Sequence, residues 1–232
     1  MRTIISSALI AVAIVILGCA LKSGIDRFSD RDRVVTVRGL CEKEVQANKV
    51  TWPIVTKEMG NDLSTIYNTI TSKNNTIVNF LKSNGLDDSE ISVNPPEVFD
   101  READRYNNAP VSYRYQVTNV VVVTSSKVAQ VRELIKKQTE LLQKGIAIVA
   151  GDYNYQTRYE YTDLNSVKPE MIAEATANAR EAADKFAKDS HSKLGKIKTA
   201  SQGQFSIDDR DQYTPNIKNI RVVTYITYYL ED

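Results

Sequence analysis

An uncharged run near the N-terminus constrains this chain more than any other feature. Residues Thr3–Leu21 read TIISSALIAVAIVILGCAL, and no charge lies between Arg2 and Lys22. At about 1.5 Å of helical rise per residue the run spans about 28 Å, close to the roughly 30 Å hydrocarbon core of a bilayer. A secretory signal has a shorter apolar region of about 7–15 residues. We therefore predict that residues 1–25 hold a retained transmembrane anchor, which contacts the membrane through residues 3–21.

Two other fates of this segment stay open. Residues Ile16–Cys19 resemble a lipobox, in which Cys19 would be acylated and become the new N-terminus. Simple signal cleavage is the remaining alternative. The orientation is also open, because Lys22, Arg27, Arg31 and Arg33 follow the run, and the positive-inside rule alone would then leave the folded part in the cytoplasm.

The composition excludes several classes of protein. The chain has 232 residues, of which 42% are hydrophobic and 25% are charged, so it is too apolar to be disordered. Its net charge of +1 gives no overall field for nucleic acid, and we expect no nucleic-acid partner. Two cysteines and one histidine exclude a disulfide framework and a Cys/His zinc site. We therefore expect no enzymatic activity, no catalytic residues, no metal and no cofactor.

Hydrophobic periodicity predicts an α+β fold after a polar spacer at residues 26–33. Hairpin-joined strands favour mainly antiparallel sheets with helices packed on one face. The expected order is ββα-ββα-βα-ββ within one domain, residues 34–232, which can also be divided into subdomains of about 34–125 and 126–232. Strands are expected near residues 34–37 (ended by Gly39), 44–58, 91–99, 113–124, 146–161, 196–207 and 217–230, and helices near 61–85, 126–145 and 167–190.

Two of these segments have especially clear patterns. The strand at 113–124 alternates apolar and polar side chains, and one of its faces is apolar apart from Asn119. The helix from Val167 carries a stripe of mostly small residues, which would let it lie close to a sheet. The residues of that stripe are Met171, Ala175, Ala179, Ala182 and Phe186.

Three stretches together resemble the SIMPL domain family of bacterial envelope proteins. They are the alternating strand Tyr113–Thr124, the Ala-rich helix Ala175–Ala187 followed by Leu194-Gly195, and the helix stop Asn84–Leu86 followed by Ile91–Val93. The resemblance runs from about Val34 to Leu230. It implies an α+β fold that is usually exported, sometimes assembled into large oligomers, and associated with stress tolerance. It brings no catalytic motif, and it favours a periplasmic location for the folded domain.

Several residues invite a functional role, but each is better explained structurally. Tyrosines 153, 155, 159 and 161 are expected on one strand face in the core, and at least one of Tyr225, Tyr228 and Tyr229 should face solvent or a partner. His191 is expected to be solvated or to lie at a helix cap, and Cys41 is expected to be a structural or free thiol.

Two acidic clusters are expected to be loops. Asp208, Asp209 and Asp211 lack the spacing of an EF-hand and fit a polar hairpin loop. Asp100, Glu102 and Asp104 are interleaved with Arg101 and Arg105, which suits a loop that pairs its own charges.

The sequence therefore predicts a non-enzymatic, membrane-tethered envelope protein. It would sit in the bacterial inner membrane with a single pass and a periplasmic domain, or be a lipoprotein anchored through Cys19. Long strands with free edges favour assembly with further copies of the chain. The alternative is a periplasmic module that binds a small ligand or peptide, in a groove near loops Asp100–Asn108 and Gln204–Asn216.

Overall fold

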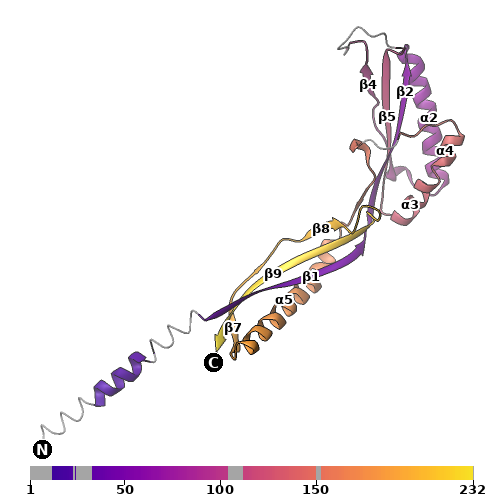
Figure 1. The fold of residues 1–232 in the computed structure, drawn as a ribbon. Coiled ribbons are helices and arrows are strands. Elements are labelled where there is room, and N and C mark those ends of the chain that lie inside the picture. Colours follow the sequence, from indigo (N-terminus) through magenta and orange to yellow (C-terminus); the bar gives the residue numbers. More distant parts are fainter. Residues whose placement is uncertain (1–11, 23, 25–32, 104–111, 150–152, 232) are drawn as a thin grey trace, which may run out of the picture. The chain divides into compact units, whose positions relative to one another are not determined.

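A computed structural model describes residues 12–22, 24, 33–103, 112–149 and 153–231 of the chain (Figure 1). These residues form two compact units. The first comprises Met1–Lys43, Leu164–Ile207 and Asn219–Asp232, and the second comprises Glu44–Asp163 and Asp208–Lys218. The units interleave along the chain, whereas the subdomains considered above follow one another.

The N-terminal segment is described only in part. Residues 12–22 are helical, and their apolar side chains, such as Ile14 and Leu17, are exposed. Residues 3–11 of the predicted anchor lie outside the described residues. Within the part of the chain that is described, no helix is both long and apolar enough to cross a membrane.

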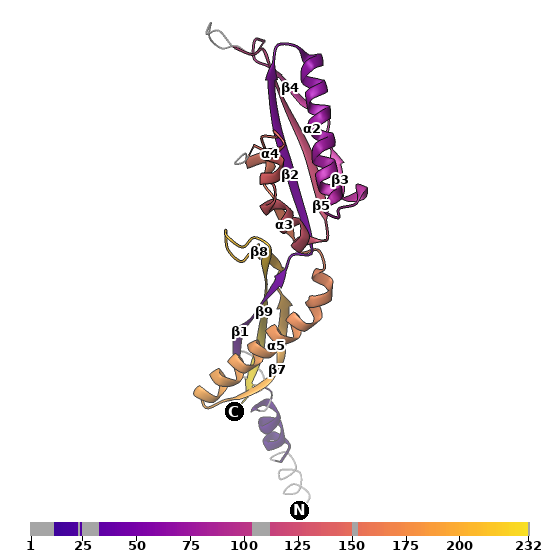
Figure 2. The same ribbon diagram turned by 90° about the vertical axis from the view of Figure 1, so that its right-hand side faces the viewer.

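The first sheet is antiparallel where its strand register is given, and it carries one long helix. Its order is β1-β9-β7, and β8 also pairs with β9. Helix α5 lies beside these strands in both views (Figures 1 and 2). The elements are β1 (Val34–Gln46), α5 (Leu164–Asp189), β7 (Lys193–Gln202), β8 (Ser206–Asp209) and β9 (Ile217–Glu231).

Small side chains hold α5 against this sheet. The buried residues of the helix recur every four positions: Met171, Ala175, Ala179, Ala183 and Ala187. The predicted stripe is correct for its first three members, but Phe186 is 61% exposed and Ala182 is only partly buried. Residues four apart form a row that is inclined to the helix axis. The contact with the sheet follows this row to Ala183 and Ala187, whereas the predicted stripe takes a step of three after Ala179 and so reaches Ala182 and Phe186.

Gly39 is the point of closest approach between helix and sheet. It lies inside β1 and does not end the strand as predicted. A Cβ atom built on Gly39 would lie 1.8 Å from the carbonyl oxygen of Ala175 and 2.6 Å from the backbone nitrogen of Ala179. A glycine within a strand often marks such a close backbone approach.

The second sheet is also antiparallel, with the order β3-β5-β2-β6, and β4 also pairs with β5. Helix α2 begins after Asp62, whose carboxylate accepts hydrogen bonds from the N–H groups of Ser64 and Thr65. The elements are β2 (Lys49–Gly60), α2 (Leu63–Ser83), the 3₁₀ turn η2 (Asp88–Glu90), β3 (Ile91–Val93), β4 (Glu97–Asp100), β5 (Tyr115–Ser125), α3 (Val128–Lys136), α4 (Thr139–Gln143), the 3₁₀ turn η3 (Tyr153–Tyr155) and β6 (Arg158–Glu160).

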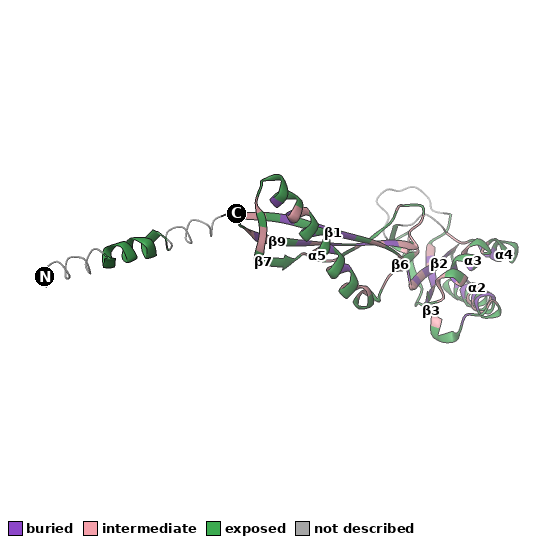
Figure 3. Ribbon diagram, turned by 90° about the horizontal axis from the view of Figure 1, so that it is seen from below, coloured by how far each residue is buried: buried purple, intermediate pink, exposed green. Residues whose placement is uncertain are grey.

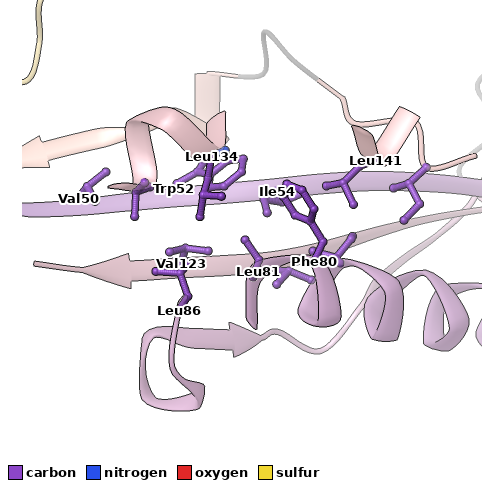
Figure 4. Packing of buried hydrophobic residues seen from close by; sticks show 13 residues of the cluster. Val50, Trp52, Ile54, Phe80, Leu81, Leu86, Val123, Leu134 and Leu141 are labelled. Carbon is purple, nitrogen blue, oxygen red and sulfur yellow. The ribbon is translucent and has the colours of Figure 1, made fainter. Parts of the chain in front are cut away.

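One hydrophobic core joins this sheet to its helices. Trp52 and Ile54 of β2 meet Phe80 and Leu81 of α2 and Leu134 of α3 (Figure 4). The partners of Trp52 and Ile54 on β5 belong to the same cluster, so the three helices cover one face of the sheet. The α+β class, the antiparallel sheets and the placement of the helices are as predicted.

Three details of the predicted element order are wrong. The first two strands do not form a hairpin, because β1 and β2 belong to different sheets. The expected helix at 126–145 is divided into α3 and α4, and the change of direction after Lys136 leaves Leu141 buried and Leu142 exposed. The strand expected through Tyr153–Tyr161 is reduced to a 3₁₀ turn and the three residues of β6.

The approach at Gly39 gives a direct test of the packing. We predict that Gly39→Ala lowers the free energy of unfolding by about 2–3 kcal/mol, because the added methyl group must push α5 away from β1. Urea denaturation of the purified chain measures this. Ser201→Ala, at an exposed position on β7, should stay within about 0.5 kcal/mol of the parent chain. Equal stability of the two variants would contradict the close packing.

Candidate interaction surfaces

Strand β1 forms one edge of the first sheet, and its alignment with β9 follows from three contacts. The N–H of Leu230 donates to the carbonyl of Arg33 at 2.9 Å. The hydroxyls of Thr36 and Thr227 lie 3.0 Å apart, and Arg38 lies 5.2 Å from the ring centroid of Tyr225. These pairs share one antiparallel register, so this part of β1 contains no bulge.

The backbone groups of alternate β1 residues therefore point away from β9. Because Arg33 bonds to β9, the outward residues are Val34, Thr36, Arg38 and Leu40. The side-chain amide of Asn178 on α5 donates to the carbonyl of Leu40 at 2.8 Å, which agrees with this direction. We call the outward N–H and C=O groups of Val34, Thr36 and Arg38 the β1 edge.

Strand β7, at the opposite edge of the sheet, has features that disfavour pairing with a further strand. Strand β7 carries Lys193, Lys196 and Lys198 and has register shifts around Ile197, and nearly all of it is exposed (Figure 3). Lysines and irregular register are common devices that prevent edge-to-edge association. The start of β1 reads VVTV, with neither charge nor proline, so the β1 edge is the better template for a further strand.

The face of the sheet that is turned away from α5 is solvent-accessible. The open face includes Thr36, Arg38 and Leu40 on β1 and Arg221 and Tyr225 on β9. Leu40 and Tyr225 are 40% and 39% exposed. Arg38 stacks on Tyr225, so the face combines apolar area with positive charge.

The family is decided by the match of this sequence to a family model. Residues 35–220 match the family model named SIMPL, described as a protein of unknown function (DUF541). This chain belongs to the SIMPL family. A comparison with curated proteins finds no match.

The C-terminal tyrosines of this SIMPL domain occupy both faces of β9, as predicted. Tyr225 lies on the open face, whereas Tyr228 is buried and packs with Val37 and Ala179 under α5. Tyr229 lies 5.4 Å from the ammonium group of Lys198.

The two cysteines have different surroundings. Cys41 is a free, buried thiol that donates to the carboxylate of Glu174 at 3.2 Å. Burial, followed by the Glu174 hydrogen bond, raises the pKa of Cys41 to about 11, so the thiol stays protonated and is a poor nucleophile. Cys19 is free and exposed within helical residues 12–22, and its acylation stays a prediction.

His191 lies at the end of α5, as predicted. It is exposed and has a left-handed backbone with φ of 56°. The N–H of Ser192 donates to the carbonyl of Ala187 at 2.8 Å, which closes the last helical turn.

The loop predicted for the acidic cluster at 208–211 is only partly correct: Asp208 and Asp209 end strand β8, and Asp211 lies in the loop between β8 and β9. Asp209 pairs with Lys218, and Asp211 pairs with Arg210 and accepts the N–H groups of Tyr213 and Thr214 at 2.8 Å. The carboxylates thus point to separate partners. Across the described ranges, no three His, Cys, Asp or Glu side chains are grouped to hold a metal ion.

Two other predictions concern loop charges and tyrosines. Asp100 and Glu102 pair with Arg114, the residue before β5, at 2.9 and 3.6 Å, so their partner lies beyond the predicted loop; Asp104 and Arg105 lie outside the described residues. Tyr153 is 83% exposed, whereas Tyr159 packs against the core, and its burial raises the pKa of Tyr159. The tyrosines therefore do not share one strand face.

Glu90 is the centre of a charged cluster beside β5. Its carboxylate accepts from the Asp87 N–H at 2.9 Å, the Ser125 hydroxyl at 2.6 Å and the Lys127 ammonium at 2.9 Å. These hydrogen bonds lower the pKa of Glu90 to about 2, and the one from the Asp87 N–H has the largest effect. Every acceptor oxygen already has a partner, so the cluster clamps η2 to the end of β5 and offers no free acid or base.

The sign of this pKa shift fixes the expected pH dependence. The ionised form of Glu90 stabilises the fold above its usual pKa near 4.5, and this contribution is lost as the pH falls towards 2. We predict that Glu90→Gln lowers the free energy of unfolding at pH 7 by about 2 kcal/mol, with a smaller loss below pH 3. Urea titrations across this range measure it, with exposed Glu181→Gln as the control. An equal loss at pH 7 and pH 2.5 would refute the clamp.

Proposed function

We propose that this SIMPL protein is a non-enzymatic, membrane-tethered scaffold of the cell envelope that works by self-assembly. Its anchor would be residues 3–21, with a single pass through the bacterial inner membrane and the folded domain in the periplasm. Acylation of Cys19 is the alternative tether. The supporting observation is the β1 edge, a regular stretch of strand with outward hydrogen-bonding groups, whose first four residues, Val34–Val37, carry no charge.

The β1 edge suits a second copy of the same chain as its partner. Two identical edges can pair antiparallel around a two-fold axis, because each supplies alternating donors and acceptors to the other. The open face then lies beside the new contact and offers Leu40 and Tyr225 as apolar area for a further copy. Two separate surfaces are what an assembly larger than a dimer requires.

Tethering would make even weak edge pairing effective. Twelve residues, 22–33, separate the apolar run from β1, so the β1 edge would lie at most about 40 Å from the anchor. Chains confined to one membrane meet at a much higher effective concentration than free chains do.

Two features support a non-enzymatic role. The chain has a single histidine, which lies exposed at a helix end, and its buried thiol is protonated at neutral pH. A surface that binds copies of itself needs neither group.

The proposal is tested by removing one outward N–H from the β1 edge. Thr36→Pro deletes a donor that points away from β9, and proline is tolerated on edge strands. Thr36→Val is the matched control, since it loses the same hydroxyl contact with Thr227 but keeps the N–H. We expect cross-linking of the detergent-solubilised chain to give discrete species larger than a dimer for the parent and for Thr36→Val, and smaller species for Thr36→Pro.

Circular dichroism would verify that each variant is folded. A strictly monomeric parent chain would refute self-assembly. An unchanged pattern for folded Thr36→Pro would show that the β1 edge is not the contact.

A further inference from the structure

Helix α2 has an unusual solvent-facing composition. About half of its 21 residues are Ser, Thr or Asn, and none is Asp or Glu. Such residues compete with the helical backbone for hydrogen bonds and are poor helix formers. Helix formation alone therefore does not account for this surface, which is rich in hydroxyl and amide groups.

Two adjoining hollows run along one flank of α2. The first, of about 310 Å³, lies between the helix and the end of β2, from Glu58 to Asp62. The second, of about 470 Å³, is lined by Asn68, Thr69, Ser72, Lys73, Thr76, Lys144 and Ile146. Thr69 lines both hollows, and we call the two together the α2 groove. From Thr65 to Thr76 it follows about 16 Å of helix.

The floor of the α2 groove is held by polar contacts between the helix and the sheet. Lys73 pairs with Glu58, and both side chains are only about one-fifth exposed. Behind them, the side chains of Asn74 and Asn119 exchange two hydrogen bonds at 2.6 and 3.2 Å, and the Asn119 amide reaches the hydroxyl of Thr56 at 3.4 Å. This explains the polar residue on the apolar face of β5, and it fixes the position of α2.

The groups that line the α2 groove match a ligand rich in hydroxyls. The hydroxyls of Thr69 and Thr76 donate to the carbonyls of Thr65 and Ser72, at 2.9 and 3.0 Å, so their oxygens remain as acceptors for a ligand's O–H. Asn68 and Ser72 are exposed and supply both donors and acceptors.

One end of the α2 groove carries a positive charge. Lys144 is exposed beyond the end of α4, and its ammonium forms no ion pair within the described part of the chain. Because Lys73 is neutralised by Glu58, Lys144 supplies the positive charge of the second hollow, whereas the carboxylate of Asp62 lies in the first hollow.

We propose that the α2 groove binds a short acidic oligosaccharide. Its sugar hydroxyls would donate to Thr69 and Thr76 and exchange hydrogen bonds with Asn68 and Ser72, and its carboxylate would pair with Lys144. A small inorganic anion would leave the acceptors unused, and an apolar ligand would find only Met59, Ile66 and Ile146 as large apolar side chains in the lining. This site is independent of the β1 edge.

Calorimetric titration of the detergent-solubilised full chain with trigalacturonate tests the site. Maltotriose and inorganic phosphate are the comparison probes. We expect trigalacturonate to bind and both comparison probes to bind at least ~10-fold more weakly, a difference of about 1.4 kcal/mol. Lys144→Gln and Ser72→Glu should each weaken trigalacturonate binding at least ~10-fold, the first by removing the cation and the second by adding a repelling carboxylate.

Two matched variants control for general effects of charge. Lys137→Gln removes an exposed lysine outside the α2 groove, and Asn75→Glu adds a carboxylate on an exposed position of α2 that does not line it. Both should leave the affinity within about two-fold. No binding of trigalacturonate, equal binding of phosphate or maltotriose, or equal effects of groove and control variants would each overturn the proposal.

Discussion

The close contact between helix α5 and strand β1 determines what the first unit can offer to other molecules. A glycine at position 39 and alanines at 175 and 179 bring the two backbones together, so one helix is enough to cover one face of the sheet. In the described part of that unit, no helix covers the opposite face and no strand pairs with the outer side of β1. The packing therefore creates a sheet with one buried face, one open face and one unguarded edge.

Much of this arrangement can be predicted from the sequence. The alternation through β5 and the apolar spacing of α2 predict their elements well, because each face contacts a single kind of environment. Asn119 stands out in the sequence, but its partner Asn74 lies on a helix 45 residues away, and no local pattern shows that contact. Gly39 carried a usable signal, since a glycine within a strand-like run can mark backbone contact as well as a strand end.

The errors share one physical cause. Periodicity shows which residues face a core, but not which strand supplies the hydrogen bonds. Alternation continues from β1 into β2, although the two strands pair in different sheets. The tyrosines from 153 to 161 also alternate, yet in the described structure the strand pairing of this segment is confined to Arg158–Glu160, which pairs with Lys49–Thr51 of β2. Membership of the SIMPL family fixes the fold without assigning an activity, so the functional argument rests on the surfaces that the fold leaves free.

Hydrogen–deuterium exchange at single amides of β1 tests the central claim most directly. The amides of Val35 and Val37 point towards β9 and should be protected at every protein concentration. The amides of Val34, Thr36 and Arg38 should exchange quickly in dilute protein and become protected as the concentration rises and copies associate. Fast exchange of these three amides at all concentrations would contradict assembly through the β1 edge.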